Sequence, residues 1–147
     1  MQKINFIPGL GEKPKDYIAI SKYLNVVDID WNNCRTSLGK VDTLIGFSLG
    51  GILACMHTEK NKVKKLILCS PTPMENMDDV KADEIIFLVG SKEKWALQNI
   101  HRIYKKLKCK KTIIIIPGAE HKITGNYRKK LLELIKDNYL LSPYFIG

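Results

Sequence analysis

The sequence has no apolar run of the ~18 residues that a helix needs to cross a bilayer, so no membrane span is expected. Residues 1–9 also lack the long apolar segment and the small-residue cleavage site of a signal peptide. Both absences favour a cytoplasmic protein. The 147 residues are 45% hydrophobic and 27% charged, which is typical of one soluble globular domain covering residues 1–147.

Arginine is scarce, although the chain is strongly basic. The formal net charge is +9, but only three of the 24 basic residues are arginines, namely Arg35, Arg102 and Arg128. Arginine is the residue that binds phosphates and base edges in bidentate geometry. We therefore expect no nucleic acid among the partners. The alternative, a basic nucleic-acid-binding protein, predicts steeply salt-dependent binding.

The four cysteines form no C-x-x-C pair, which argues against a zinc site or a redox motif. Cys55, Cys69 and Cys109 lie in or beside apolar segments, so they are expected to be buried thiols in a reducing compartment. No metal is expected in this protein.

Two kinds of segment alternate along the chain. Short apolar runs, typical of strands covered on both faces, are Lys3–Ile7, Val26–Ile29, Thr43–Phe47, Lys64–Cys69, Glu84–Val89 and Thr112–Ile116. Helical spacing occurs over Asp16–Leu24, Gly50–Lys60, Trp95–Leu107 and Asn126–Leu141. The link from Asp30 to Val41 is too short for a full helix and is expected to hold a turn. The alternation predicts right-handed βαβ units, hence a three-layer α/β/α sandwich with a mostly parallel sheet of about six strands.

In such sheets, ligands bind at the carboxyl ends of the strands, beside the point where the strand order reverses. The loops expected there are Pro8–Lys13, Phe47–Gly51, Ser70–Asp83, Gly90–Lys94 and Pro117–Ile123.

The strongest functional signal is Gly46-Phe47-Ser48-Leu49-Gly50, a G-x-S-x-G match between a predicted strand and a predicted helix. A nucleophile on such a turn has a strained backbone, and side chains two residues to either side would collide, so both flanking positions need glycine. The turn lifts the serine oxygen clear of the sheet and places N–H groups of the next helix beneath a developing oxyanion. We predict that Ser48 is a nucleophile; the alternative is a glycine-rich packing turn.

A nucleophilic serine needs a base, and the chain has three histidines. His57 and His101 fall inside predicted helices, away from the carboxyl ends of the strands. His121 lies in the loop after the last strand, at the expected catalytic edge. We therefore predict that His121 is the general base.

The base needs a carboxylate to orient it. Glu93 lies in the loop after the fifth strand and is the candidate by position. Glu120 is adjacent to His121 in sequence, but adjacent side chains rarely point at each other. Asp83 and Glu84 precede the fifth strand and lie at its other end.

An oxyanion hole needs two donors, and the N–H groups of Leu10 and Leu49 are the candidates. Leu10 lies in the glycine-flanked segment Pro8–Gly11, whose backbone can approach a substrate closely. A phosphate-binding loop is the alternative for this segment. A dinucleotide fingerprint would require a third glycine where Pro14 stands, so a nucleotide site is not expected.

With these motifs in this order, the chain resembles the α/β-hydrolase family over nearly its whole length. Ser48, Glu93 and His121 follow the family's nucleophile–acid–histidine order, with glutamate in place of the commoner aspartate. Pro8–Gly11 is similar to the family's H-G-x-G oxyanion loop, with proline in place of histidine. The resemblance implies a truncated α/β-hydrolase core, because family members usually begin with two further strands. It also implies a serine hydrolase that uses no metal and no organic cofactor.

Many family members insert a cap domain before the strand that precedes the acid, where this chain has only Pro71–Asp83. The site is therefore expected to be shallow and open, with modest rates, and suited to short-chain acyl esters or thioesters. Its walls are expected to come from Gly9, Leu10, Phe47, Pro71, Met74, Met77 and Trp95.

Two hypotheses follow for the function. The first is a serine esterase whose partner is a small-molecule acyl ester. The second is a catalytically inactive α/β-hydrolase-like binding module, since a fold does not guarantee activity. A homodimer that covers an exposed sheet edge is a further arrangement that this architecture permits.

Overall fold

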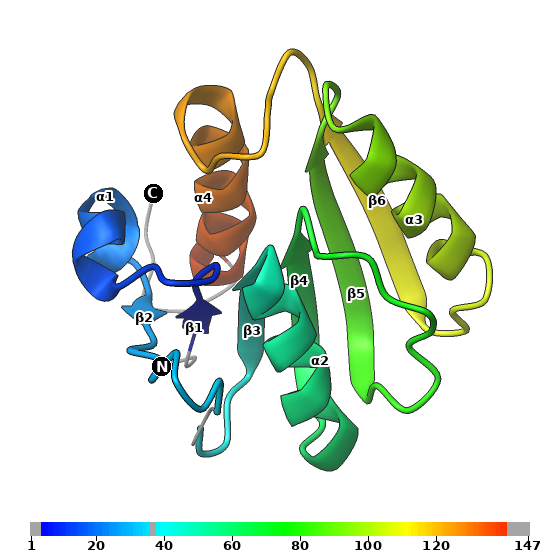
Figure 1. The fold of residues 1–147 in the computed structure, drawn as a ribbon, viewed down its shortest axis with the longest axis horizontal. Coiled ribbons are helices and arrows are strands. Elements are labelled where there is room, and N and C mark those ends of the chain that lie inside the picture. The colour runs from blue at the N-terminus through cyan, green and yellow to red at the C-terminus, as the bar shows by residue number, and fades with distance from the viewer. Residues whose placement is uncertain (1–3, 36–37, 141–147) are drawn as a thin grey trace.

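The computed structural model describes residues 4–35 and 38–140, and only the backbone of residues 137–140. At its centre lies a six-stranded sheet in the order β2-β1-β3-β4-β5-β6 (Figure 1). The strands are β1 (Ile4–Ile7), β2 (Asn25–Val26), β3 (Thr43–Phe47), β4 (Val63–Cys69), β5 (Ala82–Gly90) and β6 (Lys110–Ile116). Every neighbouring pair is parallel, which confirms the predicted sheet.

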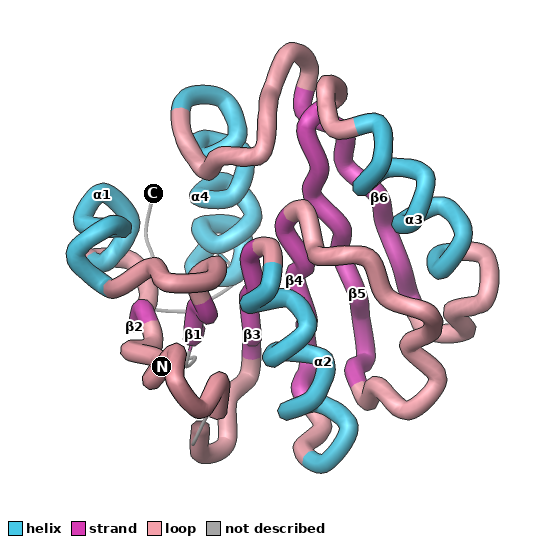
Figure 2. Tube along the Cα trace, in the orientation of Figure 1, coloured by secondary structure: helices cyan, strands magenta, loops and turns pink. Residues whose placement is uncertain are grey.

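Helices cover both faces of the sheet, which confirms the three-layer α/β/α arrangement (Figure 2). The helices α2 (Leu49–Lys60) and α3 (Lys94–Tyr104) share one apolar core, to which they contribute Leu53 and Ile100. The helices α1 (Ile18–Ser21) and α4 (Gly125–Leu140) share the core on the opposite face, to which they contribute Ile20 and Tyr127.

The strands are continuous apolar runs because helices cover both faces of the sheet. In β4, Leu66 and Leu68 pack into the core beneath α2 and α3, whereas Ile67 and Cys69 pack into the core beneath α4. Successive side chains of a strand point to opposite faces, so a strand covered on both faces needs an apolar residue at every position.

The strand order reverses between β1 and β3, because the chain winds outward to β2 on one side and through β4, β5 and β6 on the other. Ligand sites in open α/β sheets lie at such a switch point, at the carboxyl ends of the strands. The loops after β1 and β3 therefore border the expected site.

The predicted helix over Asp16–Leu24 is wrong in extent. A 3-10 helix over Pro14–Tyr17 runs into the single turn of α1, Ile18–Ser21. Proline fixes φ at the first position of the 3-10 helix. The Asp16 carboxylate accepts the N–H of Lys13 at 2.8 Å and tightens that first turn.

The predicted strand over Val26–Ile29 is also too long. β2 covers only Asn25–Val26 and pairs with β1 alone, so it has no partner strand on its outer side in the described part of the chain. Beyond it, the Val27 N–H still donates to the Phe6 carbonyl at 2.8 Å, and the carbonyl of Ile29 accepts the Lys13 ammonium at 2.7 Å.

The link that follows contains the expected turn. The carbonyl of Asp30 accepts the N–H groups of Asn33 (3.1 Å) and Cys34 (2.8 Å). Asp30 also forms an antiparallel bridge with Arg35. Residues 36 and 37 of the link lie outside the described residues.

Candidate active site

The turn after β3 carries Ser48 in a strained backbone conformation, with φ 56° and ψ −120°. A Cβ atom on Gly46 would lie 2.4 Å from the carbonyl oxygen of Gly50, and one on Gly50 would lie 2.2 Å from that of Ile7. Both positions therefore require glycine, as the motif predicted. The strain is held by the neighbouring strand, because the N–H of Ser48 donates to the carbonyl of Cys69 at 3.0 Å.

Three side chains from three loops form a continuous hydrogen-bonded chain. The Ser48 Oγ lies 3.0 Å from Nε2 of His121, and Nδ1 of His121 lies 2.5 Å from Oε1 of Glu93. We call this arrangement the serine–histidine–glutamate chain. The His121 side chain is half exposed, so a small molecule can reach it from solvent, and its ring stacks on Phe47 at a centroid distance of 5.0 Å.

The Glu93 carboxylate is held from three sides and is only 8% exposed. Besides His121, it accepts the Ser70 hydroxyl at 2.6 Å and the Gly90 N–H at 2.8 Å. Burial by itself would raise the pKa of Glu93. The hydrogen bonds from His121, Ser70 and Gly90 outweigh burial, so the pKa of Glu93 lies below its ordinary value and the group stays ionised.

The ionised Glu93 acts in turn on His121. The hydrogen bond with Glu93 raises the pKa of His121 above its ordinary value, against the lowering effect of burial. The charges of Glu93 and Glu12 raise it further. The arrangement therefore favours the imidazolium form that a general base adopts after it takes a proton.

Behind Glu93 lie two buried hydroxyl groups that the sequence did not reveal. Ser70 follows β4 with a φ of 45°, and its Oγ lies 2.7 Å from the hydroxyl of Tyr127, which is fully buried. Because an ionised carboxylate only accepts, Ser70 donates to Glu93. The single proton of Tyr127 is then shared between Ser70 and the carbonyl of Leu88, at 3.0 Å.

The two predicted oxyanion donors lie on either side of the switch point. Leu49 is the first residue of α2, so its N–H belongs to the helix-end donors that have no partner within the helix. Leu10 lies in the loop after β1 and is 66% exposed. Gly9 approaches the turn after β3 closely, since a Cβ atom on it would lie 3.4 Å from the Phe47 ring.

The residues expected to line the site differ in their exposure and in the elements that hold them. Pro71 packs against the first turn of α2, since a Cβ atom on Gly51 would lie 3.0 Å from it. Met74 is held against α3, where the Asn99 side chain bonds its backbone N–H and carbonyl. Trp95 is 84% exposed in the first turn of α3. Their contact with a substrate stays a prediction.

Met77 was wrongly expected at the site. It is 5% exposed and belongs to the core beneath α3. It also lines a pocket of about 400 Å³ together with Ala82, the first residue of β5, and Leu107. That pocket lies at the amino end of β5, so Met77 fills the core at the opposite edge of the sheet from Ser48.

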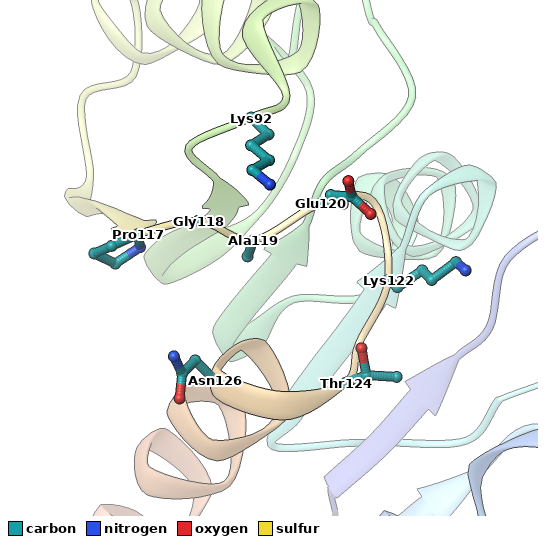
Figure 3. A pocket seen from close by; sticks show the side chains of 8 residues that line it. All are labelled: Lys92, Pro117, Gly118, Ala119, Glu120, Lys122, Thr124 and Asn126. Atoms are coloured by element: carbon teal, nitrogen blue, oxygen red, sulfur yellow. The ribbon is translucent and has the colours of Figure 1, made fainter.

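A polar pocket of about 330 Å³ adjoins the loop that carries His121 (Figure 3). Its lining residues are Lys92, Pro117, Gly118, Ala119, Glu120, Lys122, Thr124 and Asn126. They flank Glu93 and His121 in sequence, whereas Ser48 is not among them. The loop that places His121 is therefore open to solvent on this side as well.

The described residues contain no group of three or more His, Cys, Asp or Glu side chains that could hold a metal ion. Of the predicted buried thiols, Cys55 and Cys69 are buried and Cys109 is half-buried. Burial raises the pKa of Cys55 to about 12, so this thiol stays protonated and unreactive. No helix in the described ranges is long and apolar enough to cross a membrane.

Comparison with known proteins gives no match among family models or curated proteins, but several matches among solved structures. A dienelactone hydrolase from Anabaena variabilis matches with a TM-score of 0.65 at 16% identity, over 92% of this chain and 84% of that chain. A monoacylglycerol lipase from Paleococcus ferrophilus matches with a TM-score of 0.65 at 16% identity, over 95% and 94%. An α/β serine hydrolase without lid from Xanthomonas campestris matches with a TM-score of 0.61 at 13% identity, over 99% and 85%.

These likenesses extend over nearly the whole chain, so the protein has the α/β-hydrolase fold that its sequence motifs resemble. At such low identity, these likenesses establish the fold alone. The reaction has to be argued from the residues of this site.

Proposed function

We propose that the protein is a serine hydrolase that cleaves carboxylic esters, either short-chain acyl esters or thioesters, through an acyl-enzyme on Ser48. The observation that carries this proposal is the serine–histidine–glutamate chain, with distances of 3.0 and 2.5 Å, built on a strained turn at the carboxyl edge of the sheet. A merely structural hydrogen-bonded chain would need neither the strain at Ser48 nor the exposure of His121.

In the first half of the reaction, Ser48 Oγ attacks the ester carbonyl while Nε2 of His121 takes its proton. The tetrahedral intermediate then collapses: the bond between the acyl carbon and the leaving oxygen or sulfur breaks, the imidazolium gives its proton to the leaving group, and the acyl group stays on Ser48 Oγ. Glu93 fixes the tautomer of His121 by accepting from Nδ1, and its charge stabilises the imidazolium. The N–H groups of Leu10 and Leu49 stabilise the oxyanion that forms on the carbonyl oxygen.

In the second half, a water molecule attacks the acyl carbon and His121 takes its proton. The tetrahedral intermediate collapses, the carboxylic acid leaves, and Ser48 Oγ recovers its proton from His121. The same groups thus serve both half-reactions.

The preference for short acyl groups rests on how the segment between β4 and β5 is fixed. The Arg102 guanidinium donates to the carbonyls of Met74 and Glu75, and Asn99 bonds the backbone of Met74 at 3.1 and 3.2 Å. These contacts tie the segment to α3. A site without a cap buries little of a long acyl chain, so binding energy and water exclusion are both limited.

Labelling with a fluorophosphonate probe, read by intact mass and peptide mapping, tests the proposal. We expect stoichiometric modification of Ser48 in the wild-type protein and none in Ser48→Ala or His121→Ala. Ser21→Ala is the matched control, because Ser21 is exposed and its hydroxyl donates to the nearby carbonyl of Ile18. Folded wild-type protein that takes up no probe would contradict the proposal and favour the inactive binding module. A panel of esters and thioesters of increasing acyl length then identifies the preferred substrate.

A further inference from the structure

One carboxylate near the site takes no part in the serine–histidine–glutamate chain. Oε1 of Glu12 accepts the Gly9 N–H at 2.7 Å and the Tyr17 hydroxyl at 2.6 Å. The backbone of Glu12 closes the same turn, since its N–H donates to the Gly9 carbonyl at 3.0 Å. Its own carbonyl accepts the indole N–H of Trp31 at 2.7 Å. Four hydrogen bonds therefore fix Glu12 in the loop that also carries Leu10.

The packing of this loop leaves little freedom. A Cβ atom on Gly9 would lie 2.8 Å from Oε1 of Glu12 and 3.4 Å from the Phe47 ring, so the Gly9 backbone is wedged between the two. The Phe47 ring also stacks on His121. The position of the Gly9–Leu10 peptide relative to the general base is therefore set by Glu12 on one side and Phe47 on the other.

Tyr17 is a rigid anchor for the carboxylate. Its side chain is buried, with its ring against Phe6 at a centroid distance of 4.7 Å. Burial, followed by the hydrogen bond with Glu12, raises the pKa of Tyr17 far above its ordinary value, so the hydroxyl stays protonated and remains a donor.

The charge of Glu12 also reaches His121. Glu93 faces His121 from the loop after β5, and Glu12 acts on it from the loop after β1. The last residue of β3 and the turn after it bring Phe47 and the uncharged Ser48. The chain neighbours of His121 are the oppositely charged Glu120 and Lys122. Besides Glu93, the charge of Glu12 raises the pKa of His121.

We propose that Glu12 is a positioning residue for the ester hydrolysis, with two separable roles. Its Oε1 atom holds the Gly9 N–H, and with it the backbone that leads into Leu10, so that the Leu10 N–H points at the developing oxyanion. Its charge stabilises the imidazolium of His121. This inference rests on the proposed function. The negative charge of Glu12 also disfavours the negatively charged oxyanion, so its two effects on the reaction rate oppose each other. Loss of this charge therefore changes the pH dependence of the reaction more than the rate at the alkaline plateau.

Two conservative substitutions separate the roles. Glu12→Gln keeps an oxygen that can accept from both Gly9 and Tyr17 but removes the charge. Glu12→Asp keeps the charge, but its carboxylate is shorter by one C–C bond of ~1.5 Å and cannot reach both donors. Asp16→Asn is the matched control, since Asp16 makes the same kind of contact with the Lys13 N–H one turn further along.

The experiment measures kcat and KM for a short-chain p-nitrophenyl ester over a range of pH, the rate of fluorophosphonate labelling, and thermal midpoints as a check on folding. We expect Glu12→Asp to lower kcat about 10–100-fold with KM nearly unchanged, because an oxyanion contact is made only in the transition state. The acid limb of its pH–rate profile should stay at the wild-type pH, because the charge that acts on His121 is kept. We expect Glu12→Gln to keep kcat within about threefold, while its acid limb moves to lower pH because the pKa of His121 falls.

The outcomes distinguish the two proposals. If wild-type Ser48 labels and both Glu12 variants match wild type in kcat and pH profile, the positioning role is overturned while the hydrolase stands. If both variants lose activity together with thermal stability, Glu12 is merely structural and the inference is also overturned. If wild-type Ser48 takes up no probe, both proposals fall.

Discussion

The strained turn at Ser48 leaves no space for a side chain at the flanking Gly46. A Cβ atom on Gly46 would lie 2.4 Å from the carbonyl oxygen of Gly50 and 2.7 Å from the Cα atom of Gly51. These are backbone atoms, so no side chain can move aside. We expect Gly46→Ala to lower the free energy of unfolding by at least about 2 kcal/mol, as overpacking does, and to abolish labelling of Ser48. Urea unfolding and the fluorophosphonate probe measure the two effects.

Gly39→Ala is the control for this substitution, because a Cβ atom on Gly39 meets nothing within 4 Å. We expect it to change the free energy of unfolding by less than about 0.5 kcal/mol. Wild-type stability and labelling in Gly46→Ala would show that the tight turn is not what holds Ser48 in place.

Ser70 provides a second prediction, because its hydroxyl donates to Glu93 from a buried position. A hydrogen bond to a charged group is worth about 1.5–3 kcal/mol, so we expect Ser70→Ala to be destabilised by this amount near neutral pH. The folded-state pKa of Glu93 lies below its ordinary value. The stability gained from ionised Glu93 is therefore present above its unfolded-state pKa and lost as the pH falls through its folded-state pKa.

Because Ser70→Ala removes one of the contacts that lower the pKa of Glu93, the difference between variant and wild type should shrink as the pH is lowered and Glu93 protonates. Urea unfolding at a series of pH values from about 7 to about 3 measures this. A difference that stays constant over the whole series would mean that Ser70 contributes packing rather than charge stabilisation.

The sequence predicted the members of the serine–histidine–glutamate chain because each follows a strand, in a recognisable order along the chain. Their catalytic roles stay a prediction. The groups behind them escaped prediction for physical reasons. Tyr127 has the spacing of a core residue on α4, and Ser70 and Glu12 are ordinary polar residues in loops. Only the packed structure shows that their hydroxyl and carboxyl groups face the site.

At the scale of elements, the strands that are covered on both faces were predicted best. β3 has the predicted bounds Thr43–Phe47, and β4 to β6 extend their predicted runs by one or two residues at an end. The elements at the β2 edge were predicted poorly. There a two-residue strand and a single helical turn take their length from the contacts of Lys13, Pro14 and Asp16, which no hydrophobic period records.

The segment between β4 and β5 provides the prediction at this scale. Asn99 and Arg102 of α3 bind the backbone of Met74 and Glu75. We expect the double variant Asn99→Ala/Arg102→Ala to free the segment without unfolding the sheet, because β4 and β5 stay paired along their length. Backbone amides of residues 71–81 should then exchange about tenfold faster, as measured by hydrogen exchange and mass spectrometry.

Gln98→Ala is the matched control, because Gln98 is an exposed residue of the same helix. Its exchange should equal that of the wild-type protein. Unchanged exchange in the double variant would mean that core packing of Met77, rather than α3, fixes the segment.

At the scale of the whole molecule, the net charge of +9 matters for association rather than for the fold. Part of this charge lies beside the candidate site, where the exposed Lys92, Lys94 and Lys122 flank Glu93 and His121 in sequence. Lys92 and Lys122 also line the pocket of Figure 3. A positive field at an open site raises the encounter rate of anionic substrates.

We therefore predict that kcat/KM for an ester that carries a carboxylate falls about 3–10-fold between about 20 mM and about 500 mM salt, while that of a neutral ester of equal acyl length stays nearly constant. Replacing Lys92 and Lys122 by glutamine should weaken the salt dependence. The matched control replaces two exposed lysines that lie away from Ser48, namely Lys60, the last residue of α2, and Lys108, in the loop between α3 and β6. Both double variants lower the net charge equally. If both weaken the salt dependence of kcat/KM to the same extent, the overall charge, and not the lysines beside His121, steers the substrate.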